Sequence, residues 1–506
     1  MFSLMRYSQW QHCCRRALSM LRNQAYVGGE WRNAGSGETF EVLNPFDGSV
    51  VGRVPDMSES DVKLAVDTAQ RAFTVGEFSN TTAKERSDLL RGWYNLMVKH
   101  AEDLAQIMTM ESGKSLAESR GEVKYGNSFV EWFAEEARRV NGEVIQSPVR
   151  GREVLLLKQP VGVAALITPW NFPHAMITRK AGAALAVGCT CVVKPSEETP
   201  LTALALANLA EQAGFPAGVF NVVTTSPKNS AAVGKLLCED ARVRVMSFTG
   251  STAVGKILYR QCASTIKRLS LELGGNAPFV VFESADIDLA VAGAMASKFR
   301  NTGQTCVSAN RFFVHENVHT EFVDKFVSKI NSDIKMGDGS REGITNGPLI
   351  KESQLKMVSD LVNDALTKGA KLHCGGKPLP ELGPLFYGPT VLTRVTKEMQ
   401  IYNKEIFGPV AVINKFSSEE EVLREANNTP VGLAGYFYSK DISQVFRVAR
   451  KLEVGMVGVN EGLISCTEAA FGGIKESGLG REGSHHGIDD FVDVKYVCIG
   501  NVAYQS

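Results

Sequence analysis

The chain lacks several features that mark whole classes of protein. Lys plus Arg and Asp plus Glu number 55 each among 506 residues, so a formal net charge of zero offers no electrostatic attraction to nucleic acid or a broad membrane surface. No apolar run approaches the length needed to span a bilayer. Neither an internal repeat nor a long low-complexity stretch stands out. We therefore expect neither nucleic acid nor a membrane as a partner.

Cysteine is sparse, and its spacing does not suggest a disulfide framework. A chain of 506 residues is long enough for two or three domains with cores of their own. None of the ten cysteines forms a Cys-x-x-Cys pair, which favours reduced thiols in an intracellular compartment. They are Cys13, Cys14, Cys189, Cys191, Cys238, Cys262, Cys306, Cys374, Cys466 and Cys498.

The N-terminal segment carries arginine but no acid before Glu30. The arginines are Arg6, Arg15, Arg16 and Arg22, and one helical face carries Cys14, Leu18 and Leu21. This pattern is typical of a mitochondrial transit peptide, which we place at residues 1–24 and which predicts a location in the mitochondrial matrix. A disordered basic tail is the alternative.

The periodicity of apolar residues predicts two α/β regions. Helical signals dominate residues 58–141, with capping boxes that begin at Ser58 and Thr82 and a stop at Gly113. Short apolar runs then alternate with helical stretches over 161–273, which predicts a parallel sheet covered by helices on both faces. A second alternation over 277–465 predicts a second α/β domain. Two extended segments, Glu153–Gln159 and Asp490–Ile499, could be edge strands that pair between subunits.

Cys306 and Glu272 are the strongest candidates for catalysis. Cys306 lies among small residues, as an accessible nucleophile would, and Glu272 stands on a glycine-rich turn from which a carboxylate could activate water. Together they fit covalent catalysis at an acyl-level carbon. The alternative for Cys306 is a buried apolar residue, which is the more common fate of a free cysteine.

The segment 248–256 contains a glycine-rich turn that follows a predicted strand and opens a helix. Such a turn can present backbone N–H groups to phosphate, but Ile257 replaces the Ser or Thr of a Walker loop, and the segment is not Gly-x-Gly-x-x-Gly. An ordinary strand-to-helix turn is the alternative.

Residues 315–319 match the zinc-protease pattern His-Glu-x-x-His, but we reject a metal site. His315 ends a predicted strand and Asn317 marks a turn, so His315 and His319 would not share a helical face. No third ligand is evident, and we expect no metal.

Arg179 and Arg300 stand in apolar or small surroundings, where a guanidinium requires an anionic partner. Each could bind a carboxylate of a ligand, and a structural salt bridge is the alternative for each.

Seven motifs, taken together and in order, resemble the aldehyde dehydrogenase superfamily from about Tyr26 to Ile499. They are residues 168–173 (TPWNFP), 194–197 (KPSE), 248–251 (FTGS), 272–275 (ELGG), 303–306 (GQTC), 405–409 (EIFGP) and 471–473 (FGG). Within the superfamily the chain is most similar to succinate-semialdehyde dehydrogenases, through residues 177–180 (ITRK), 298–301 (KFRN) and 463–465 (LIS).

The resemblance implies a three-part architecture. A Rossmann-type NAD-binding domain would take residues 25–144 and 164–276, and a catalytic domain would take 277–466. A small β oligomerisation element would take 145–163 and 485–506, and 467–484 would return the chain to the NAD-binding domain. A homotetramer built from dimers is implied.

The resemblance also implies roles for individual residues. Cys306 would be the nucleophile, Glu272 the base for water, and Asn171 a donor to the oxyanion. Arg179, Arg300 and Ser465 would bind a distal carboxylate beside Phe172 and Phe471. The residues around the cofactor would be Thr168, Pro169, Trp170, Lys194, Ser196, Glu197, Phe248, Gly250, Ser251, Gly255, Leu273, Glu405 and Phe407. Glu197 would pair with ribose hydroxyls and repel a 2′-phosphate, which favours NAD over NADP.

The implied activity is NAD-dependent oxidation of succinate semialdehyde to succinate, in GABA degradation. The alternatives are another carboxy-aldehyde such as glutarate semialdehyde, a CoA-acylating dehydrogenase, which would not need Glu272, and a non-catalytic structural protein on the same fold. Some members of the family carry a second cysteine two residues after the nucleophile. Ser308 stands there, so we expect that redox switch to be absent.

Overall fold

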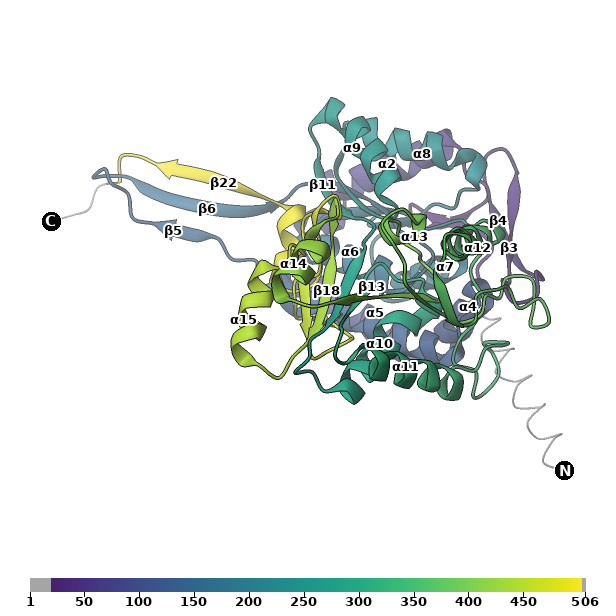
Figure 1. The fold of residues 1–506 in the computed structure, drawn as a ribbon. Coiled ribbons are helices and arrows are strands. Elements are labelled where there is room, and N and C mark those ends of the chain that lie inside the picture. Colours follow the sequence, from purple (N-terminus) through teal and green to yellow (C-terminus); the bar gives the residue numbers. More distant parts are fainter. Residues whose placement is uncertain (1–19, 503–506) are drawn as a thin grey trace.

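The computed structural model describes residues 20–502 and contains two large sheets, each built mainly from parallel strands (Figure 1). The first has the order β2-β1-β9-β8-β7-β10-β11-β21. The strands from β9 to β11 run parallel, while β1 and β21 join the edges antiparallel. Their bounds are β1 Ala25–Val27, β2 Glu30–Arg32, β7 Val163–Ile167, β8 Thr190–Lys194, β9 Phe220–Val222, β10 Val243–Thr249, β11 Arg268–Glu272 and β21 Gly478–Leu479.

Helices cover both faces of this sheet, as the alternation of strands and helices predicted. One face is covered by α3 (Ala83–Lys99), α4 (Ala101–Ser112), α5 (Leu116–Glu136), α6 (Ala175–Val187) and α7 (Pro200–Gln212). The other is covered by α2 (Glu59–Thr74), α8 (Pro227–Glu239) and α9 (Thr252–Cys262). All five residues of β7 are buried, which is the pattern of a strand covered on both faces.

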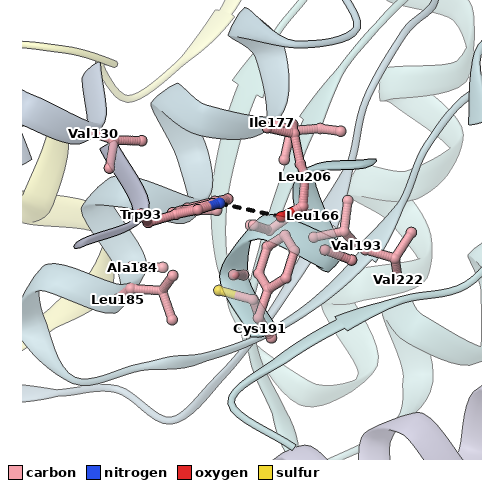
Figure 2. Packing of buried hydrophobic residues seen from close by; sticks show 14 of the residues in the cluster. Trp93, Val130, Leu166, Ile177, Ala184, Leu185, Cys191, Val193, Leu206 and Val222 are labelled. Atoms are coloured by element: carbon pink, nitrogen blue, oxygen red, sulfur yellow. Dashed lines mark hydrogen bonds between the residues drawn. The ribbon is translucent and has the colours of Figure 1, made fainter. Parts of the chain in front are cut away.

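The core beneath α3 and α5–α7 is built around Trp93 (Figure 2). The Trp93 indole N–H donates to the backbone oxygen of Leu206 at 3.1 Å, so the one polar atom of the ring is satisfied. Leu166 and Val193 of the sheet complete this layer. Cys191 lies in the same cluster, and burial raises the pKa of its thiol well above the usual value, so it is an apolar residue in practice.

Local sequence signals account for several helix ends. Both predicted capping boxes form, at Ser58 with Asp61 and at Thr82 with Glu85. Gly113 ends α4 with φ +73°, and a Cβ there would also meet Pro348 at 2.8 Å.

The second large sheet has the order β14-β15-β16-β13-β12-β18-β19 and is parallel except at β14. The bounds are β12 Ala277–Val281, β13 Ala309–His315, β14 Lys371–Cys374, β15 Thr390–Thr393, β16 Val410–Phe416, β18 Ala434–Tyr438 and β19 Met456–Val459. Its helices are α10 Ile287–Phe299, α11 His319–Asp333, α12 Glu352–Thr367, α13 Gln400–Asn403, α14 Glu419–Asn427 and α15 Ile442–Lys451. Short pairs, β3 (Thr39–Leu43) with β4 (Val50–Pro55) and β17 (Val431–Gly432) with β20 (Ile474–Lys475), lie outside both sheets.

The two extended segments form a third sheet that extends away from the body (Figure 1). β22 (Val492–Ile499) pairs antiparallel with β6 (Glu153–Pro160), from Val492 opposite Pro160 to Ile499 opposite Glu153. β5 (Glu143–Ile145) pairs with the other side of β6. The two segments pair with each other within one chain, so β6 is an inner strand, while β22 keeps one open edge.

The structure also refines the ends of this three-stranded sheet. The 3₁₀-helix η5 (His485–Phe491) belongs to the body, since Ile488 and Phe491 are buried in the core with Trp93.

At the other end of the chain, Met20 is buried in that core and the Arg22 guanidinium donates to the Asn208 side chain at 3.1 Å. Most of the predicted leader, residues 1–19, lies outside the described residues.

Within residues 20–502, no helix is both long enough and apolar enough to cross a membrane.

Candidate active site

The predicted site residues gather where parallel strands of the first sheet end and the second sheet begins. The adjacent strands β8, β7, β10 and β11 end at Lys194, Ile167, Thr249 and Glu272. The predicted cofactor residues Thr168, Pro169, Trp170, Ser196, Glu197, Gly250, Ser251 and Leu273 directly follow these ends, and Phe248 lies one residue before one of them. A ligand that crosses the sheet at its carboxyl edge would meet all of them.

The loop before Cys306 has an unusual backbone. Asn301, Thr302 and Gly303 are consecutive left-handed residues, with φ of 52°, 55° and 75°. A run of this kind is costly and is retained only where its surroundings hold it. Gly303 has no alternative residue, because a Cβ there would lie 2.2 Å from the Gly408 backbone oxygen.

Side chains from other elements hold this loop in place. The Glu118 carboxylate of α5 accepts the Asn301 N–H at 2.5 Å, and the Thr302 hydroxyl donates to the Gly347 oxygen at 3.0 Å. Gln304 accepts the Ile350 N–H at 2.9 Å. Cys306, half-buried directly after this loop, is therefore presented from a fixed backbone.

Asn171 is buried beside the same loop. Its side-chain amide donates to the Gln304 backbone oxygen at 3.1 Å, while its Oδ1 has no hydrogen-bond partner among the described residues. Its backbone oxygen accepts from Asn301 Nδ2 at 3.0 Å and from Lys114 Nζ at 2.7 Å. Asn171 is thus tied to the loop that carries Cys306.

Lys114 is a residue of this site that sequence reasoning missed. Its ammonium is buried, lies 2.5 Å from the Glu122 carboxylate and 4.6 Å from the centre of the Phe172 ring. Glu122 also accepts the His174 N–H at 2.9 Å, at the start of α6. Lys114 thereby connects the Asn171–Phe172 segment to α5. The signal available in the sequence was a Gly-Lys pair at the end of a predicted helix, which is too common to be informative.

Glu272 is 3% exposed, and neither of its carboxyl oxygens has a hydrogen-bond partner among the described residues. Burial raises its pKa well above the usual value, and the nearby Glu482 raises it further, against the charges of Arg179 and Lys180. A Cβ at Gly472 would lie 2.9 Å from Glu272 Oε1, which explains the glycine in that motif. A neutral, unattached carboxyl is free to move and to exchange a proton with water.

The Cys306 thiol feels the charges of the predicted acid and of both predicted arginines. Burial raises its pKa to about 12, and Glu405 and Glu272 contribute to the rise, while Arg179 and Arg300 oppose it. These four side chains, from distant parts of the sequence, therefore lie within electrostatic range of the thiol. The pKa of the Cys191 thiol, by contrast, is raised by burial and by the thiol of Cys189, so the surroundings of Cys306 fit a nucleophile better than those of Cys191 do.

Arg179 is 2% exposed and stacks on two aromatic rings, 4.1 Å from the centre of Phe471 and 5.1 Å from that of Phe129. Its Nε lies 2.8 Å from Glu482 Oε2, so the structural salt bridge weighed for this residue is present. Its Nη2 has no hydrogen-bond partner among the described residues. A second carboxylate could occupy that donor.

Arg300 differs, because in the part of the chain that the structure describes it pairs with no carboxylate. Its guanidinium lies 5.0 Å from the centre of the Phe172 ring. Arg300 and Ser465 line one small cavity, together with Thr305, Val307 and Tyr436. Of the three predicted carboxylate-binding residues, Arg300 and Ser465 therefore face a common space beside Thr305 and Val307, the residues that flank Cys306, while Arg179 is not part of its lining.

The glycine-rich turn was expected to present backbone N–H groups to phosphate, but the N–H of Gly250 is already bonded. It donates to the Glu272 backbone oxygen at 3.0 Å, so it is not available to phosphate. The Ser251 hydroxyl caps α9 by accepting the Val254 N–H at 3.3 Å. Gly250 and Gly255 are required for space, since a Cβ would lie 2.4 Å from the Phe248 ring and 2.5 Å from Leu273.

Two pairs of residues mark the rest of the predicted cofactor surface. Lys194 is buried, its pKa is lowered by burial, and the charge of the neighbouring Glu197 opposes that shift. Trp170 and Phe407 meet edge to face, with ring centres 5.4 Å apart, and Phe407 itself is left-handed at φ 50°. A ribose could contact Lys194 and Glu197, and a flat ring could lie beside Phe407.

Glu405 completes that surface and reveals a second missed residue. It accepts the Gly275 N–H at 3.2 Å, and burial raises its pKa to about 7. Lys298 is fully buried, its Nζ has no hydrogen-bond partner among the described residues, and burial lowers its pKa to about 7 while the charge of Glu405 opposes the shift. The sequence shows only a lysine in the last turn of an apolar helix, which gave no reason to select Lys298.

The described residues contain no group of three His, Cys, Asp or Glu that could hold a metal ion. His315 ends β13 and His319 begins α11, so the His-Glu-x-x-His motif spans a turn as expected. A larger hollow of about 1050 Å³ lies at α14 on the surface, but its lining of exposed charged side chains such as Glu420 and Arg424 offers no buried reactive group.

Comparison with known proteins agrees with this arrangement. Residues 31–497 match the model of the aldehyde dehydrogenase family. The mitochondrial succinate-semialdehyde dehydrogenase of Homo sapiens is 54% identical over 484 residues, which cover 96% of this chain and 90% of the human protein. The succinate-semialdehyde dehydrogenase [NADP(+)] of Escherichia coli strain K12 is 52% identical over 482 residues, 95% of this chain and 98% of that protein. A crystal structure of succinate-semialdehyde dehydrogenase from Burkholderia pseudomallei superposes with a TM-score of 0.93 at 53% identity and covers 95% of this chain and 98% of that one.

Proposed function

The chain belongs to the aldehyde dehydrogenase family, and we propose that it oxidises succinate semialdehyde to succinate with NAD. One observation supports this choice of substrate. The guanidinium groups of Arg179 and Arg300 both lower the pKa of the Cys306 thiol, and Arg179 keeps an unpaired donor. An aldehyde whose far end is a carboxylate satisfies both arginines while its carbonyl reaches the sulfur. A neutral aldehyde would leave that donor without a partner.

Cys306 supplies the nucleophile. The Cys306 thiol first loses its proton to bulk water. The thiolate then adds to the aldehyde carbon, the carbonyl electron pair moves to oxygen, and a thiohemiacetal oxyanion forms. We assign the oxyanion to the Cys306 backbone N–H and to the Asn171 amide, which keeps one N–H beyond the bond to Gln304. Loss of one such donor typically costs about 10²–10³ in rate.

The nicotinamide cofactor, when bound, supplies the acceptor for the hydride that leaves the thiohemiacetal carbon, and a thioester on Cys306 results. Glu272 first releases its own proton to bulk water, because burial keeps the resting carboxyl protonated. The carboxylate then takes a proton from the attacking water, whose oxygen adds to the thioester carbon. The carbon–sulfur bond breaks, the carboxylic acid departs, and the Cys306 thiol is restored. The unattached carboxyl of Glu272 supports this role, since a carboxylate held by other groups could not reach both water and solvent.

Residues at the strand ends would hold the cofactor. Lys194 and Glu197 would contact the adenosine ribose, Gly250, Ser251 and Gly255 would flank the pyrophosphate, and Glu405 would hold the nicotinamide ribose beside Phe407. Glu197 favours NAD, because its carboxylate repels a 2′-phosphate. Lys351 lies 3.9 Å from Glu197 and 2.8 Å from Glu198, so part of that repulsion is offset. A higher kcat/KM with NADP than with NAD would overturn this preference.

The cellular setting follows from the relatives. Their names support a mitochondrial enzyme, and succinate semialdehyde as substrate supports a step in GABA degradation. Since Met20 and Arg22 pack on the body, we propose that a leader would be cleaved before Met20 rather than after residue 24. We also propose a homotetramer, in which the exposed edges β5 and β22 meet other subunits; the apolar residues on those strands include Val144 at 77% and Tyr496 at 62% exposure.

Three rivals make different predictions. A glutarate-semialdehyde dehydrogenase would favour the longer substrate, a CoA-acylating enzyme would need CoA for turnover, and a structural protein would not turn over. The decisive experiment measures NADH formation with ω-carboxy aldehydes of three to six carbons beside neutral aldehydes of equal length. We expect the highest kcat/KM with succinate semialdehyde. A neutral aldehyde that matched it would refute the proposed substrate.

A further inference from the structure

Tyr125 of α5 lies where the predicted carboxylate-binding residues meet, although no sequence motif pointed to it. Its side chain is largely buried, and its ring contacts Phe129 edge-on, with ring centres 4.9 Å apart. It also packs against the cluster of Phe172, Ala175 and Met176. Tyr125 therefore lies between the Phe129 ring, on which Arg179 stacks, and the Phe172 ring, on which Arg300 stacks.

The hydroxyl of Tyr125 interacts with three of the predicted carboxylate-binding residues. It lies within hydrogen-bonding reach of the Ser465 hydroxyl, and the charges of Arg179 and Arg300 act on it. It is nevertheless buried without a hydrogen bond of regular geometry to any described residue. A buried phenol without a partner is costly in a folded protein, and a ligand that accepts a hydrogen bond from it would remove that cost.

Three donors surround this phenol, and together they match one type of ligand group. Arg179 Nη2 is unpaired, Arg300 has no carboxylate partner in the described chain, and Ser465 brings a hydroxyl. A carboxylate has two oxygens with about four acceptor positions, so two guanidiniums and one hydroxyl leave a position for a further donor. A phenol in these surroundings remains protonated at neutral pH, because burial raises the pKa of Tyr125.

We propose that Tyr125 is a specificity-determining residue, whose hydroxyl donates to the distal carboxylate of the substrate together with Arg179, Arg300 and Ser465. This inference rests on the proposed function. The rigid ring also limits how deep the chain of the aldehyde can extend, since Tyr125 is fixed between Phe129 and Phe172.

The test is the substitution Tyr125→Phe, which removes one oxygen and keeps the ring. KM for succinate semialdehyde should rise about tenfold, because a hydrogen bond to a charged group is lost. KM for butanal should stay within about twofold, since that substrate has no carboxylate to bind. Succinate, used as a competitive inhibitor, should lose affinity by the same factor as the substrate. Tyr94→Phe, which removes a hydroxyl from α3 outside the cleft, serves as the matched control.

The outcomes separate this inference from the proposed function. If the wild-type enzyme prefers succinate semialdehyde to butanal and Tyr125→Phe leaves that preference intact, the Tyr125 role is refuted and the function stands. If the wild type shows no preference, the proposed substrate fails and the Tyr125 role fails with it. Equal losses on both aldehydes would show that the phenol only supports the fold. Tyr125→His, which retains a ring and a donor, should recover part of the preference and provides a second reading if the phenylalanine variant folds poorly.

Discussion

The network around Lys114 and the cleft around Glu272 are both buried and both polar, but they differ in whether their groups are satisfied. Lys114 reaches Glu122 and the Asn171 oxygen, and Glu122 in turn accepts the His174 N–H. In the cleft, both Glu272 oxygens, Arg179 Nη2 and Lys298 Nζ have no hydrogen-bond partner among the described residues. Unsatisfied buried groups cost stability, so their presence together in this cleft supports the proposed ligand site there.

The comparison teaches that the two regions should respond differently to mutation. Loss of a satisfied group should lower stability, and loss of an unsatisfied one should lower activity with little effect on stability. The following predictions test that division, and each combines kinetics with the free energy of unfolding.

The largest effect is expected from Cys306→Ala. Loss of the nucleophile should reduce kcat for aldehyde oxidation by more than about 10⁴-fold, in line with removal of a catalytic nucleophile elsewhere. Stability should change little, because the thiol is half-buried. Cys498→Ala, at an exposed position on β22, is the matched control and should keep full activity. Activity that survived in Cys306→Ala would remove the thiol from the mechanism.

Glu272→Gln should slow thioester hydrolysis by about 10²–10⁴-fold, because water loses its general base. The first turnover should still release a burst of NADH, which stopped-flow fluorescence would detect. A variant without a burst but with the same slow steady rate would assign Glu272 to acylation instead.

The same substitution should also change how stability depends on pH. The folded pKa of Glu272 is raised well above 4.5, so its contribution to stability is fully present below about pH 4.5 and is lost as pH rises through the folded pKa. The glutamine side chain of the variant does not titrate. The free energy of unfolding of Glu272→Gln, relative to the wild type, should therefore increase with pH. A pH-independent difference would contradict the buried, proton-bound state of Glu272.

Lys114→Met should act on the satisfied network. It leaves Glu122 buried without its cation, so we expect a loss of about 3–5 kcal/mol in unfolding free energy. We also expect kcat to fall by about 10–100-fold with KM little changed, since Asn171 loses the contact that fixes its backbone. The double variant Lys114→Met with Glu122→Leu should regain stability but not kcat. Recovery of both would show that Lys114 supports only the fold.

Arg300→Met should have the smallest effect and the most selective one. Arg300 has no carboxylate partner in the described chain that its loss would leave unpaired. The substitution should therefore lower the free energy of unfolding by less than about 1 kcal/mol. KM for succinate semialdehyde should rise by about 10–100-fold, while KM for butanal stays unchanged. Arg179→Met is the informative counterpart, because it also strips a cation from buried Glu482 and should lose stability as well. Equal effects of Arg300→Met on both aldehydes would contradict carboxylate binding.

Much of the fold was predictable because local signals and periodicity agreed. The capping residues Ser58 and Thr82 form the boxes that their spacing predicted, and the runs at 163–167, 190–194 and 243–249 are adjacent parallel strands. Long-range pairing was not predictable in the same way. Glu153–Pro160 and Val492–Ile499 are recognisably extended, but which strand completes which depends on where the intervening chain of more than 300 residues returns.

The residues of the candidate site divide in the same way, into those that local sequence signals predicted and those that only long-range packing reveals. Motifs pointed to Cys306, Glu272 and Arg300, because each stands in a short segment of distinctive composition. Lys114 and Tyr125 have no such signal, since a lysine after a helix and a tyrosine within one are common. Their importance is visible only once α5 packs beside α6 and brings them to Asn171 and Ser465.

The sequence by itself determined the order of strands and helices, the helix ends and the choice of Cys306 as the proposed nucleophile, because these depend on neighbours within a few residues. Only the tertiary structure decided which buried charges are paired and which are left free. Glu482 comes some 300 residues after Arg179 and occupies one side of its guanidinium, while Arg300 remains open. That distinction depends on burial and distance across the whole chain, and it leaves Arg179 with one donor and Arg300 with its whole guanidinium for the proposed substrate carboxylate.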